Sequence, residues 1–231
     1  KETAKGYAHA DLKEFYHFGQ YLTAEENQSL QYPDNVLVDE LPEFNRIGKQ
    51  VFKALEQTGA AVLKGIALYL DLDPNYFEEY VQQGNSILRP IHYPPLLGEP
   101  SQAVRAAAHG DINLITLLMG AQGGGLEVQN RFGEWIPANA QMGELMINMG
   151  DMMARLTNNR LKSTIHRVIN PPKELWSESR YSIPFFMHPT ANMPLNCLSN
   201  CVSLENPAQY RPITAGNFLK QRLTELGLVK I

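Results

Sequence analysis

The sequence has few cysteines, no strong charge of one sign and no long hydrophobic run. Only Cys197 and Cys201 occur among its 231 residues, and this sparse use indicates two reduced thiols rather than a disulfide framework. The formal net charge of -4 gives no electrostatic reason to expect a nucleic-acid partner. No apolar stretch approaches the ~20 residues of a membrane span, and no signal-peptide pattern opens the chain. We therefore expect a cytoplasmic protein without a nucleic-acid or membrane partner.

The composition is that of an ordinary globular protein with one core. Hydrophobic residues make up 44% of the chain and charged residues 19%, and the length is sufficient for one sizeable core. Residues 1–85 are expected to form an N-terminal helical support region and residues 86–190 the β-rich core. Residues 191–231 would close the same domain with a strand and a helix, for which Thr214 provides a cap and Leu226 the last turn.

Apolar periodicity predicts helices before the β-rich core. Residues 42–58 carry apolar side chains at spacings of three and four, and Gly59 would end that helix. A second helix would start at Asp73-Pro74, a cap followed by the residue best suited to the first helical position. The chain is expected to start with helical structure, whereas residues 20–42 have little periodicity and indicate a surface connection.

From Ser86 onward, short apolar runs alternate with turn signals and predict about eight strands. Eight strands of this size suit a jelly roll. The predicted fold is therefore mainly β with flanking helices, a double-stranded β-helix (jelly-roll) barrel. The predicted strands are residues 87–93, 104–108, 113–119, 126–129, 134–137, 145–149, 163–169 and 181–187.

Two potential metal ligands, His109 and Asp111, lie two residues apart. On a strand, side chains at i and i+2 point to the same face, so one short strand can present both. His166 follows 55 positions after Asp111 (166 minus 111) among β-branched residues that suit a neighbouring strand. A His-x-Asp triplet alone is a weak signal. Two histidines and one carboxylate leave other coordination positions open, as in non-haem Fe(II) oxygenases, so these three residues are the candidate catalytic iron ligands.

A second paired motif is Arg180-Tyr181-Ser182, in another predicted strand. Arg180 and Ser182 share one face of that strand. A guanidinium group matches a carboxylate with two parallel hydrogen bonds, and a neighbouring hydroxyl supplies one more donor. The pair therefore predicts a carboxylate-binding site, without specifying whose carboxylate it holds.

In this order and spacing, the motifs resemble the isopenicillin N synthase-like branch of the iron- and 2-oxoglutarate-dependent oxygenases. The similarity extends from Leu88 to Pro189. Members usually begin with several dozen further residues, so the chain is expected to be a fragment or the ordered part of a longer protein. The matching segments are RPIHYPP (89–95), AHGDINLITLL (108–118), GLEVQ (125–129), NMGDM (148–152), TNNRLKSTIHRV (157–168) and RYSIPFF (180–186).

The resemblance implies a role for each motif. Arg180 and Ser182 would hold the distal carboxylate of 2-oxoglutarate, and Tyr93 would add a hydroxyl to the same cosubstrate. The implied reaction uses Fe(2+), 2-oxoglutarate and O2 to oxidise a small-molecule substrate, usually by hydroxylation, with release of succinate and carbon dioxide. The metal ligands would be His109, Asp111 and His166, and the substrate would contact Asn113, Phe186 and His188.

One departure from the family pattern and two alternatives remain. Many relatives have Thr where this chain has Gly110, and a glycine there would loosen the strand or admit bulk near the metal. Relatives that lack 2-oxoglutarate, such as isopenicillin N synthase and the ethylene-forming oxidase, keep a similar Arg-x-Ser for a substrate carboxylate. A 2-oxoglutarate-independent Fe(II) oxidase is therefore the first alternative, and a non-catalytic metal-binding barrel is the second.

Overall fold

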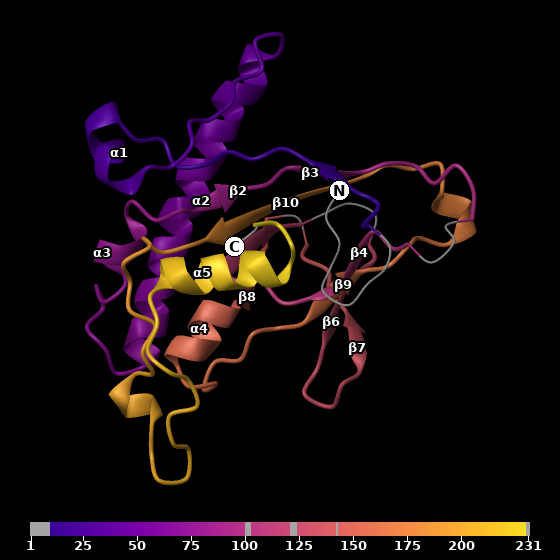
Figure 1. Cartoon of the computed structure of the whole chain (residues 1–231). Coiled ribbons are helices and arrows are strands. Elements are labelled where there is room, and N and C mark those ends of the chain that lie inside the picture. Colours follow the sequence, from indigo (N-terminus) through magenta and orange to yellow (C-terminus); the bar gives the residue numbers. More distant parts are fainter. Residues whose placement is uncertain (1–9, 100–102, 121–123, 142, 230–231) are drawn as a thin grey trace.

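Two antiparallel sheets form the centre of the molecule (Figure 1). The computed structural model describes residues 10–99, 103–120, 124–141 and 143–229. Its strands are β1 (Glu14–Phe15), β2 (Ile87–Leu88), β3 (Ile91–Tyr93), β4 (Ala106–His109), β5 (Ile115–Met119), β6 (Leu126–Gln129), β7 (Trp135–Pro137), β8 (Leu145–Met149), β9 (His166–Val168) and β10 (Arg180–Met187). The larger sheet has the order β1-β3-β10-β5-β8, with β2 also paired to β10, and the smaller sheet has the order β4-β9-β6-β7.

Each of the eight predicted strand intervals contains a strand. The predicted strand over residues 87–93 is divided into β2 and β3 at Arg89 and Pro90, because proline has no N–H to donate to a sheet. The short strand β1 was not predicted. It pairs with β3 in the register Glu14 opposite His92, which corrects the expectation that the chain starts with helical structure.

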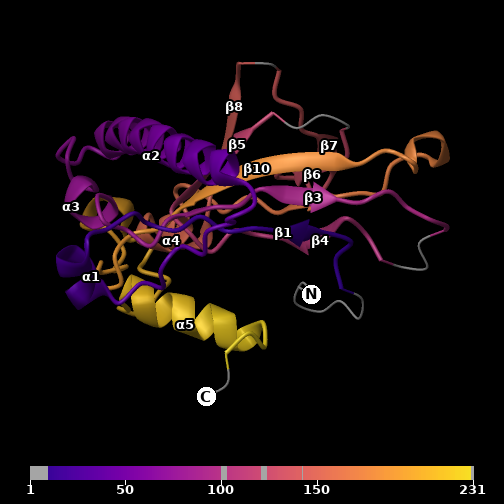
Figure 2. The ribbon, with the colours of Figure 1, turned by 90° about the horizontal axis from the view of Figure 1, so that it is seen from above.

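Helices flank the sheets. They are α1 (Ala24–Leu30), α2 (Pro42–Tyr69), α3 (Glu78–Val81), α4 (Asp151–Leu156) and α5 (Ala215–Glu225), with short 3-10 turns at Lys173–Leu175 and Ser199–Cys201. Seen from above, α2 lies along one side of the strands and α5 lies on the other (Figure 2). Helix α2 contacts β2, β5 and β10. Within the described part of the chain, no helix combines the length and apolar character needed to cross a membrane.

Helix α2 is longer than predicted, since Gly59 does not end it. Gly59 is buried inside the helix. A Cβ atom at this position would lie 2.5 Å from the Met187 sulfur and 3.3 Å from Leu117 Cδ1. The glycine therefore allows the helix to approach β10 and β5 closely, and the helix continues to Tyr69.

Residues 20–42, predicted as a surface connection, contain α1. Its N-cap is Thr23, whose hydroxyl accepts a hydrogen bond from Glu26 N at 3.2 Å. The Glu26 carboxylate in turn accepts from Thr23 N at 2.7 Å. This reciprocal capping box satisfies two backbone donors that the helix leaves without partners, which is why the helix starts here.

The helix predicted at Asp73-Pro74 starts later in the structure, whereas the helix predicted after Thr214 is present. Asp73 accepts a hydrogen bond from Asn75 N at 2.8 Å and forms a turn, and α3 begins only at Glu78. At the C-terminal end the predicted helix is confirmed, because Thr214 caps α5 by accepting from Asn217 N. The strand predicted in the same segment is wrong for the described residues 191–229, which contribute only an isolated bridge between Pro194 and Thr214. Both cysteines are free thiols, also as predicted.

The apolar side chains form two clusters. The larger one packs α2 and α5 against the larger sheet; in it, the rings of Phe52 and Phe185 meet edge to face with centroids 5.1 Å apart. The smaller cluster contains residues of both sheets, namely Ile91, Tyr93, Ala106, Leu126 and Val168. Burial of these side chains provides the main stabilisation of such a layered fold. The smaller cluster also supplies apolar walls to the cavity described next.

Candidate metal centre and cosubstrate pocket

The three predicted metal ligands lie together. His109 ends β4 and pairs in register with His166 at the start of β9, and the two imidazole centroids are 4.5 Å apart. Asp111 Oδ1 lies 3.8 Å from His166 Nε2. One potential ligand atom from each residue lies within 4.8 Å of the others. These distances allow a single ion to contact all three side chains.

Asp111 reaches this position from the loop between β4 and β5 and not from a strand. The argument that one strand presents both His109 and Asp111 was wrong, since β4 ends at His109. The Asp111 carbonyl accepts a hydrogen bond from Asp151 N at 2.7 Å. This bond connects the loop after β4 to the first residue of α4 and places the carboxylate beside the histidines.

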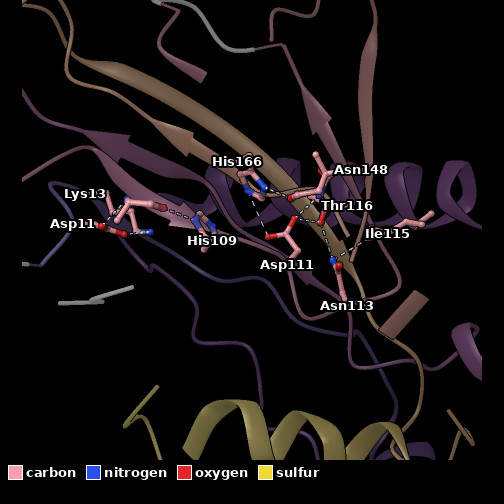
Figure 3. A network of polar contacts seen from close by, with 11 residues as sticks. Asp11, Lys13, His109, Asp111, Asn113, Ile115, Thr116, Asn148 and His166 are labelled. Carbon is pink, nitrogen blue, oxygen red and sulfur yellow. Dashed lines mark hydrogen bonds and ion pairs between the residues drawn. The ribbon is translucent and has the colours of Figure 1, made fainter. Parts of the chain in front are cut away.

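The Asp111 carboxylate is held by the larger sheet. Thr116 of β5 donates to Asp111 Oδ2 at 2.6 Å, and Asn148 of β8 donates to the same oxygen at 2.9 Å. Figure 3 shows both side chains converging on Asp111. Burial alone would raise the pKa of Asp111, but His166, His109 and the two hydrogen bonds lower it below its usual value. The carboxylate is therefore ionised at neutral pH, as a metal ligand must be.

Each of the two histidines is oriented by the carbonyl group two residues before it in the chain. His109 Nδ1 lies 2.7 Å from the Ala107 carbonyl, and His166 Nδ1 lies 3.1 Å from the Thr164 carbonyl. A proton on Nδ1 that is donated to the carbonyl leaves Nε2 as the atom with a lone pair. Burial, followed by the nearby His166, lowers the pKa of His109. Two imidazoles that present Nε2 and one carboxylate are a donor set that fits Fe(2+).

Gly110 does not provide space beside the metal ligands. A Cβ atom on Gly110 would lie 2.9 Å from Ser163 Oγ, 3.3 Å from Asp151 Oδ1 and 3.4 Å from Ile165 Cδ1. The expectation that this glycine admits bulk is therefore wrong, because neighbouring side chains already occupy that volume.

The predicted carboxylate site lies on adjacent strands of the larger sheet. Arg180 and Ser182 are buried on one face of β10, as predicted, and Arg180 pairs in register with the buried Tyr93 of β3. Arg180 Nε donates to the Gly124 carbonyl at 2.8 Å. Its Nη1 atom is buried and has no hydrogen-bond partner among the described residues. Such a donor is costly unless a ligand satisfies it, and a carboxylate fits it best.

Further charged groups surround Tyr93. The guanidinium carbons of Arg180 and Arg105 lie 4.9 Å and 5.9 Å from the Tyr93 ring centroid. Lys13 precedes β1, opposite Tyr93 in the register of β1 and β3, and it pairs with Asp11 at 2.8 Å. The cations are Arg180, Arg105 and Lys13, and the carboxylate is that of Asp11. Together they give a net charge of +2 (three minus one) around Tyr93. This charge favours a ligand with two negative charges.

One cavity of about 290 Å³ joins the two groups of residues. It is lined by the three metal-ligand candidates, by Tyr93, Arg180 and Ser182, and by Phe186. A larger hollow of about 980 Å³ lies beside α4 and α5 and is lined by none of the predicted site residues. The smaller, more enclosed cavity is therefore the candidate active site.

Two of the predicted substrate contacts lie outside this cavity. Asn113 is fully buried and donates to the Ile115 carbonyl at 3.0 Å and to Thr116 Oγ1 at 2.9 Å, so it supports the threonine that holds Asp111. His188 is buried with its backbone N donating to Ser86 at 3.3 Å. Neither side chain lines the cavity. His92 is directed away from it, as its strand position relative to Tyr93 predicts, and is hydrogen-bonded to Glu14 and Ser179.

Sequence reasoning missed several side chains of the site. Asn148 opens the matched segment 148–152, so its place in the motif was a usable signal. Arg89 and Thr116 lie in the matched segments 89–95 and 108–118 and had the same signal. Lys13 and Arg105 are brought to the site by the fold, without a local pattern in the sequence.

Comparisons with known proteins identify the family. A family model described as the 2OG-Fe(II) oxygenase superfamily matches residues 84–189. The proline hydroxylase buaE of Petromyces alliaceus is 32% identical over 232 residues, which cover 96% of this chain and 70% of that protein. The chain belongs to the 2OG-Fe(II) oxygenase superfamily. The cofactors of this family, Fe(2+) with 2-oxoglutarate and O2, are those that the sequence predicted, and the donor set described above fits them.

Other members of the superfamily show the same fold over most of this chain. A 2OG-Fe(II) oxygenase family protein from Caulobacter crescentus is 49% identical with a TM-score of 0.88, covering 98% of this chain and 73% of that chain. A full-length protein from Neurospora crassa, solved in complex with alpha-KG and thymine, is 33% identical with a TM-score of 0.82, covering 94% and 66%. These similarities confirm the double-stranded β-helix.

The curated relatives are longer than this chain. The 2-oxoglutarate-Fe(II) type oxidoreductase hxnY of Emericella nidulans is 32% identical over 186 residues, which cover 79% of this chain and 52% of that protein. The chain thus spans about half the length of such relatives.

Proposed function

We propose that this protein is an Fe(II)- and 2-oxoglutarate-dependent oxygenase that oxidises a small molecule, by hydroxylation. His109, Asp111 and His166 would hold Fe(2+). When bound together, the iron, 2-oxoglutarate and O2 supply an oxidant for a substrate C–H bond, while 2-oxoglutarate is converted to succinate and carbon dioxide. The role of the protein is to bind and orient these groups and to exclude water.

The observation that carries this proposal is the buried Nη1 atom of Arg180, without a partner among the described residues, in the cavity that contains the metal-ligand candidates. A carboxylate at this atom, with the Ser182 hydroxyl beside it on the same strand face, would satisfy a donor that water cannot easily reach. The net charge of +2 around Tyr93 favours the dianion 2-oxoglutarate over a singly charged substrate carboxylate. This preference distinguishes the proposal from a 2-oxoglutarate-independent oxidase.

Neighbouring residues would keep the reactive groups in place. The hydrogen bonds of Thr116 and Asn148 to Asp111 Oδ2 leave Oδ1 for the metal. Apolar side chains between the sheets, among them Leu126 and Val168, would limit the entry of water. A low-dielectric environment of this kind strengthens the ion pair of Arg180 with its carboxylate, provided that the hydrogen bonds are complete.

We also infer that three segments of the chain have different roles. Residues 86–190 would form the catalytic core, because the metal and cosubstrate candidates all fall in it. Residues 1–85 would support the core through α2, which contacts β2, β5 and β10. Residues 191–231 would close it through α5, whose Arg222 pairs with Asp151 of α4 at 3.3 Å. All three parts would belong to one domain.

The proposal is tested by titrating the anaerobic Fe(II) protein with 2-oxoglutarate and recording the visible charge-transfer band. Admission of O2 should then produce succinate. The Asp111→Ala variant, which keeps only two histidines for the metal, should show neither the band nor succinate. Oxygen consumption without succinate would indicate the 2-oxoglutarate-independent oxidase, and iron binding without consumption of oxygen would indicate a non-catalytic barrel.

A further inference from the structure

The residues that orient the two histidines need support of their own. His166 is oriented by the Thr164 carbonyl, and Thr164 N donates to the Met149 carbonyl of β8 at 3.3 Å. The main chain of β8 therefore holds the residue behind His166. His109 is oriented by the Ala107 carbonyl at 2.7 Å, so the position of its ring depends on what holds Ala107.

Strand pairing does not hold Ala107 in a regular ladder. β4 lies at one edge of the smaller sheet, and among the described strands it pairs with β9 alone. Ala106 pairs with Val168 and His109 with His166, but the register is irregular between these two pairs. Ala107 is buried, so its N–H needs a partner within the protein rather than water.

The partner of Ala107 is the buried carboxylate of Asp11. Ala107 N donates to Asp11 Oδ1 at 3.0 Å. The other oxygen, Oδ2, lies 2.8 Å from Lys13 Nζ. Each oxygen thus has its own contact, which fixes the orientation of the carboxylate. Figure 3 shows Asp11 and Lys13 on the side of His109 opposite Asp111.

The segment that carries Asp11 extends from one sheet to the other. Leu12 N donates at 3.0 Å to the carbonyl of Val104, two residues before β4. The next strand along the chain, β1, pairs with β3 of the larger sheet. Between these two attachments, the side chain of Lys13 lines the cavity. Asp11 is therefore held in place by contacts on both sides of it in the sequence.

These contacts form a chain that ends at a metal-ligand candidate. Asp11 holds Ala107 N, and the Ala107 carbonyl holds His109 Nδ1. On this basis, which rests on the proposed function, we propose that Asp11 is a positioning residue of the metal centre that acts on His109 through the backbone of Ala107. Asp11 does not itself line the cavity. Its role is to keep Nε2 of His109 directed at the metal, and groups behind a metal ligand are known to set metal affinity in this way.

The test compares two substitutions of similar size. Asp11→Asn keeps an acceptor for Ala107 N, whereas Asp11→Leu removes it, and both remove the charge that pairs with Lys13. Co(2+) is titrated into each protein in competition with a metal-binding dye. Asp11→Asn should bind Co(2+) nearly as tightly as the wild type. Asp11→Leu should bind it about tenfold more weakly, at the lower end of the effects of groups behind a ligand.

NMR spectra of the Co(2+) proteins show which ligand is affected. Each coordinated histidine gives one exchangeable Nδ1–H signal that is shifted by the paramagnetic ion. In Asp11→Leu the signal of His109 should move and exchange faster with solvent, while that of His166 stays unchanged. Asp11→Asn should keep both signals of the wild type. A general loss of structure would instead alter the two signals together.

Two further variants separate positioning from stability. Glu26→Ala breaks the capping box of α1, so it should lower the midpoint of urea unfolding without changing Co(2+) binding. If Asp11→Leu does not fold, the same comparison is made with Lys13→Met added to both Asp11 variants. In that background no lysine is left without its carboxylate partner, and the two proteins differ only in the acceptor for Ala107 N.

The inference is overturned if Asp11→Asn and Asp11→Leu bind Co(2+) equally, if Asp11→Leu changes both Nδ1–H signals alike, or if Glu26→Ala weakens binding as much as Asp11→Leu does. Equal binding by the two Asp11 variants and the wild type refutes only the role of Asp11. A wild type that does not bind Co(2+) refutes the proposed function itself.

Discussion

At Asp111, the two oxygens of one carboxylate have different environments. Oδ2 accepts from Thr116 and Asn148, and Oδ1 faces His166. Hydrogen bonds to a metal-binding carboxylate fix its orientation, and their loss typically lowers metal affinity. The ligand and its supporting residues therefore form one functional unit, although sequence reasoning identified only the ligand.

The Thr116→Val variant tests this unit. Valine keeps the shape of the side chain and removes the hydrogen bond, so the affinity for Fe(2+) should fall by roughly 10- to 100-fold. Competition with a metal-binding dye measures the change. Thr58→Val is the control, because Thr58 is exposed on α2 and its hydroxyl donates to the Ala54 carbonyl of the same helix; equal effects of both variants would contradict the role of Thr116.

The Arg180→Ala variant separates cosubstrate binding from metal binding. Removal of a buried charged partner of a carboxylate should weaken 2-oxoglutarate binding by about 2 kcal/mol or more, and leave the iron content nearly unchanged. Iron content and the charge-transfer titration measure the two effects separately. Arg131→Ala serves as the surface control, and loss of iron together with 2-oxoglutarate would show that Arg180 has another role.

At the scale of residues, sequence reasoning located side chains that share a short motif. His109, Asp111 and Arg180 were found because spacing and residue type together are informative. Lys13 and Arg105 were missed, since Lys13 reaches Tyr93 through the pairing of β1 with β3 and Arg105 reaches it from the other sheet; contacts between distant segments have no local signal. Burial also cannot be read from the motif, which is why Asn113 was expected to face the substrate and instead lies behind Asp111.

At the scale of elements, strands were predicted more successfully than helix ends. Short apolar runs between turns are a direct consequence of the alternating sides of a sheet. Helix α1 was missed although its Thr-x-x-Glu capping box is visible at Thr23 and Glu26 in the sequence. The end of α2 was placed too early because a glycine can either stop a helix or allow close packing, and only the neighbours of Gly59 decide between these two.

Two glycines of α2 provide a matched test of the explanation that Gly59 allows close packing of this helix. Gly59→Ala should lower the free energy of unfolding by about 1–3 kcal/mol, since a new methyl group would overlap the buried Met187. Gly65→Ala should instead raise it by about 0.5–1 kcal/mol, because nothing lies within 4 Å of the new Cβ and alanine favours helices. Urea unfolding measures both, and a stabilised Gly59→Ala protein would show that the packing argument is wrong.

At the scale of the whole molecule, His188 links stability to pH. Burial, opposed by Asp111 and assisted by Arg89, lowers the pKa of His188 to about 4, against an ordinary value of about 6.5. Below pH 6.5 the unfolded chain therefore binds a proton that the folded chain does not. The free energy of unfolding should decrease between about pH 6.5 and 4, by up to roughly 3 kcal/mol from this residue.

The His188→Gln variant checks this prediction, because glutamine does not titrate. Its unfolding free energy should vary less with pH than that of the wild type over this interval, as measured by urea unfolding at several pH values. Parallel pH profiles of the two proteins would rule out His188 as the source of the dependence.

The three metal-ligand candidates also affect how the two sheets are held together. His109 and His166 belong to the smaller sheet, whereas the Asp111 side chain is fixed by Thr116 and Asn148 of the larger sheet. An ion bound by all three would therefore cross-link the two sheets, in a chain whose cysteines are free thiols. We expect amide hydrogen exchange of β4 and β9 to slow when metal is added, while that of the distant α1 stays unchanged. Equal exchange rates with and without metal would show that the sheets are held together by packing alone.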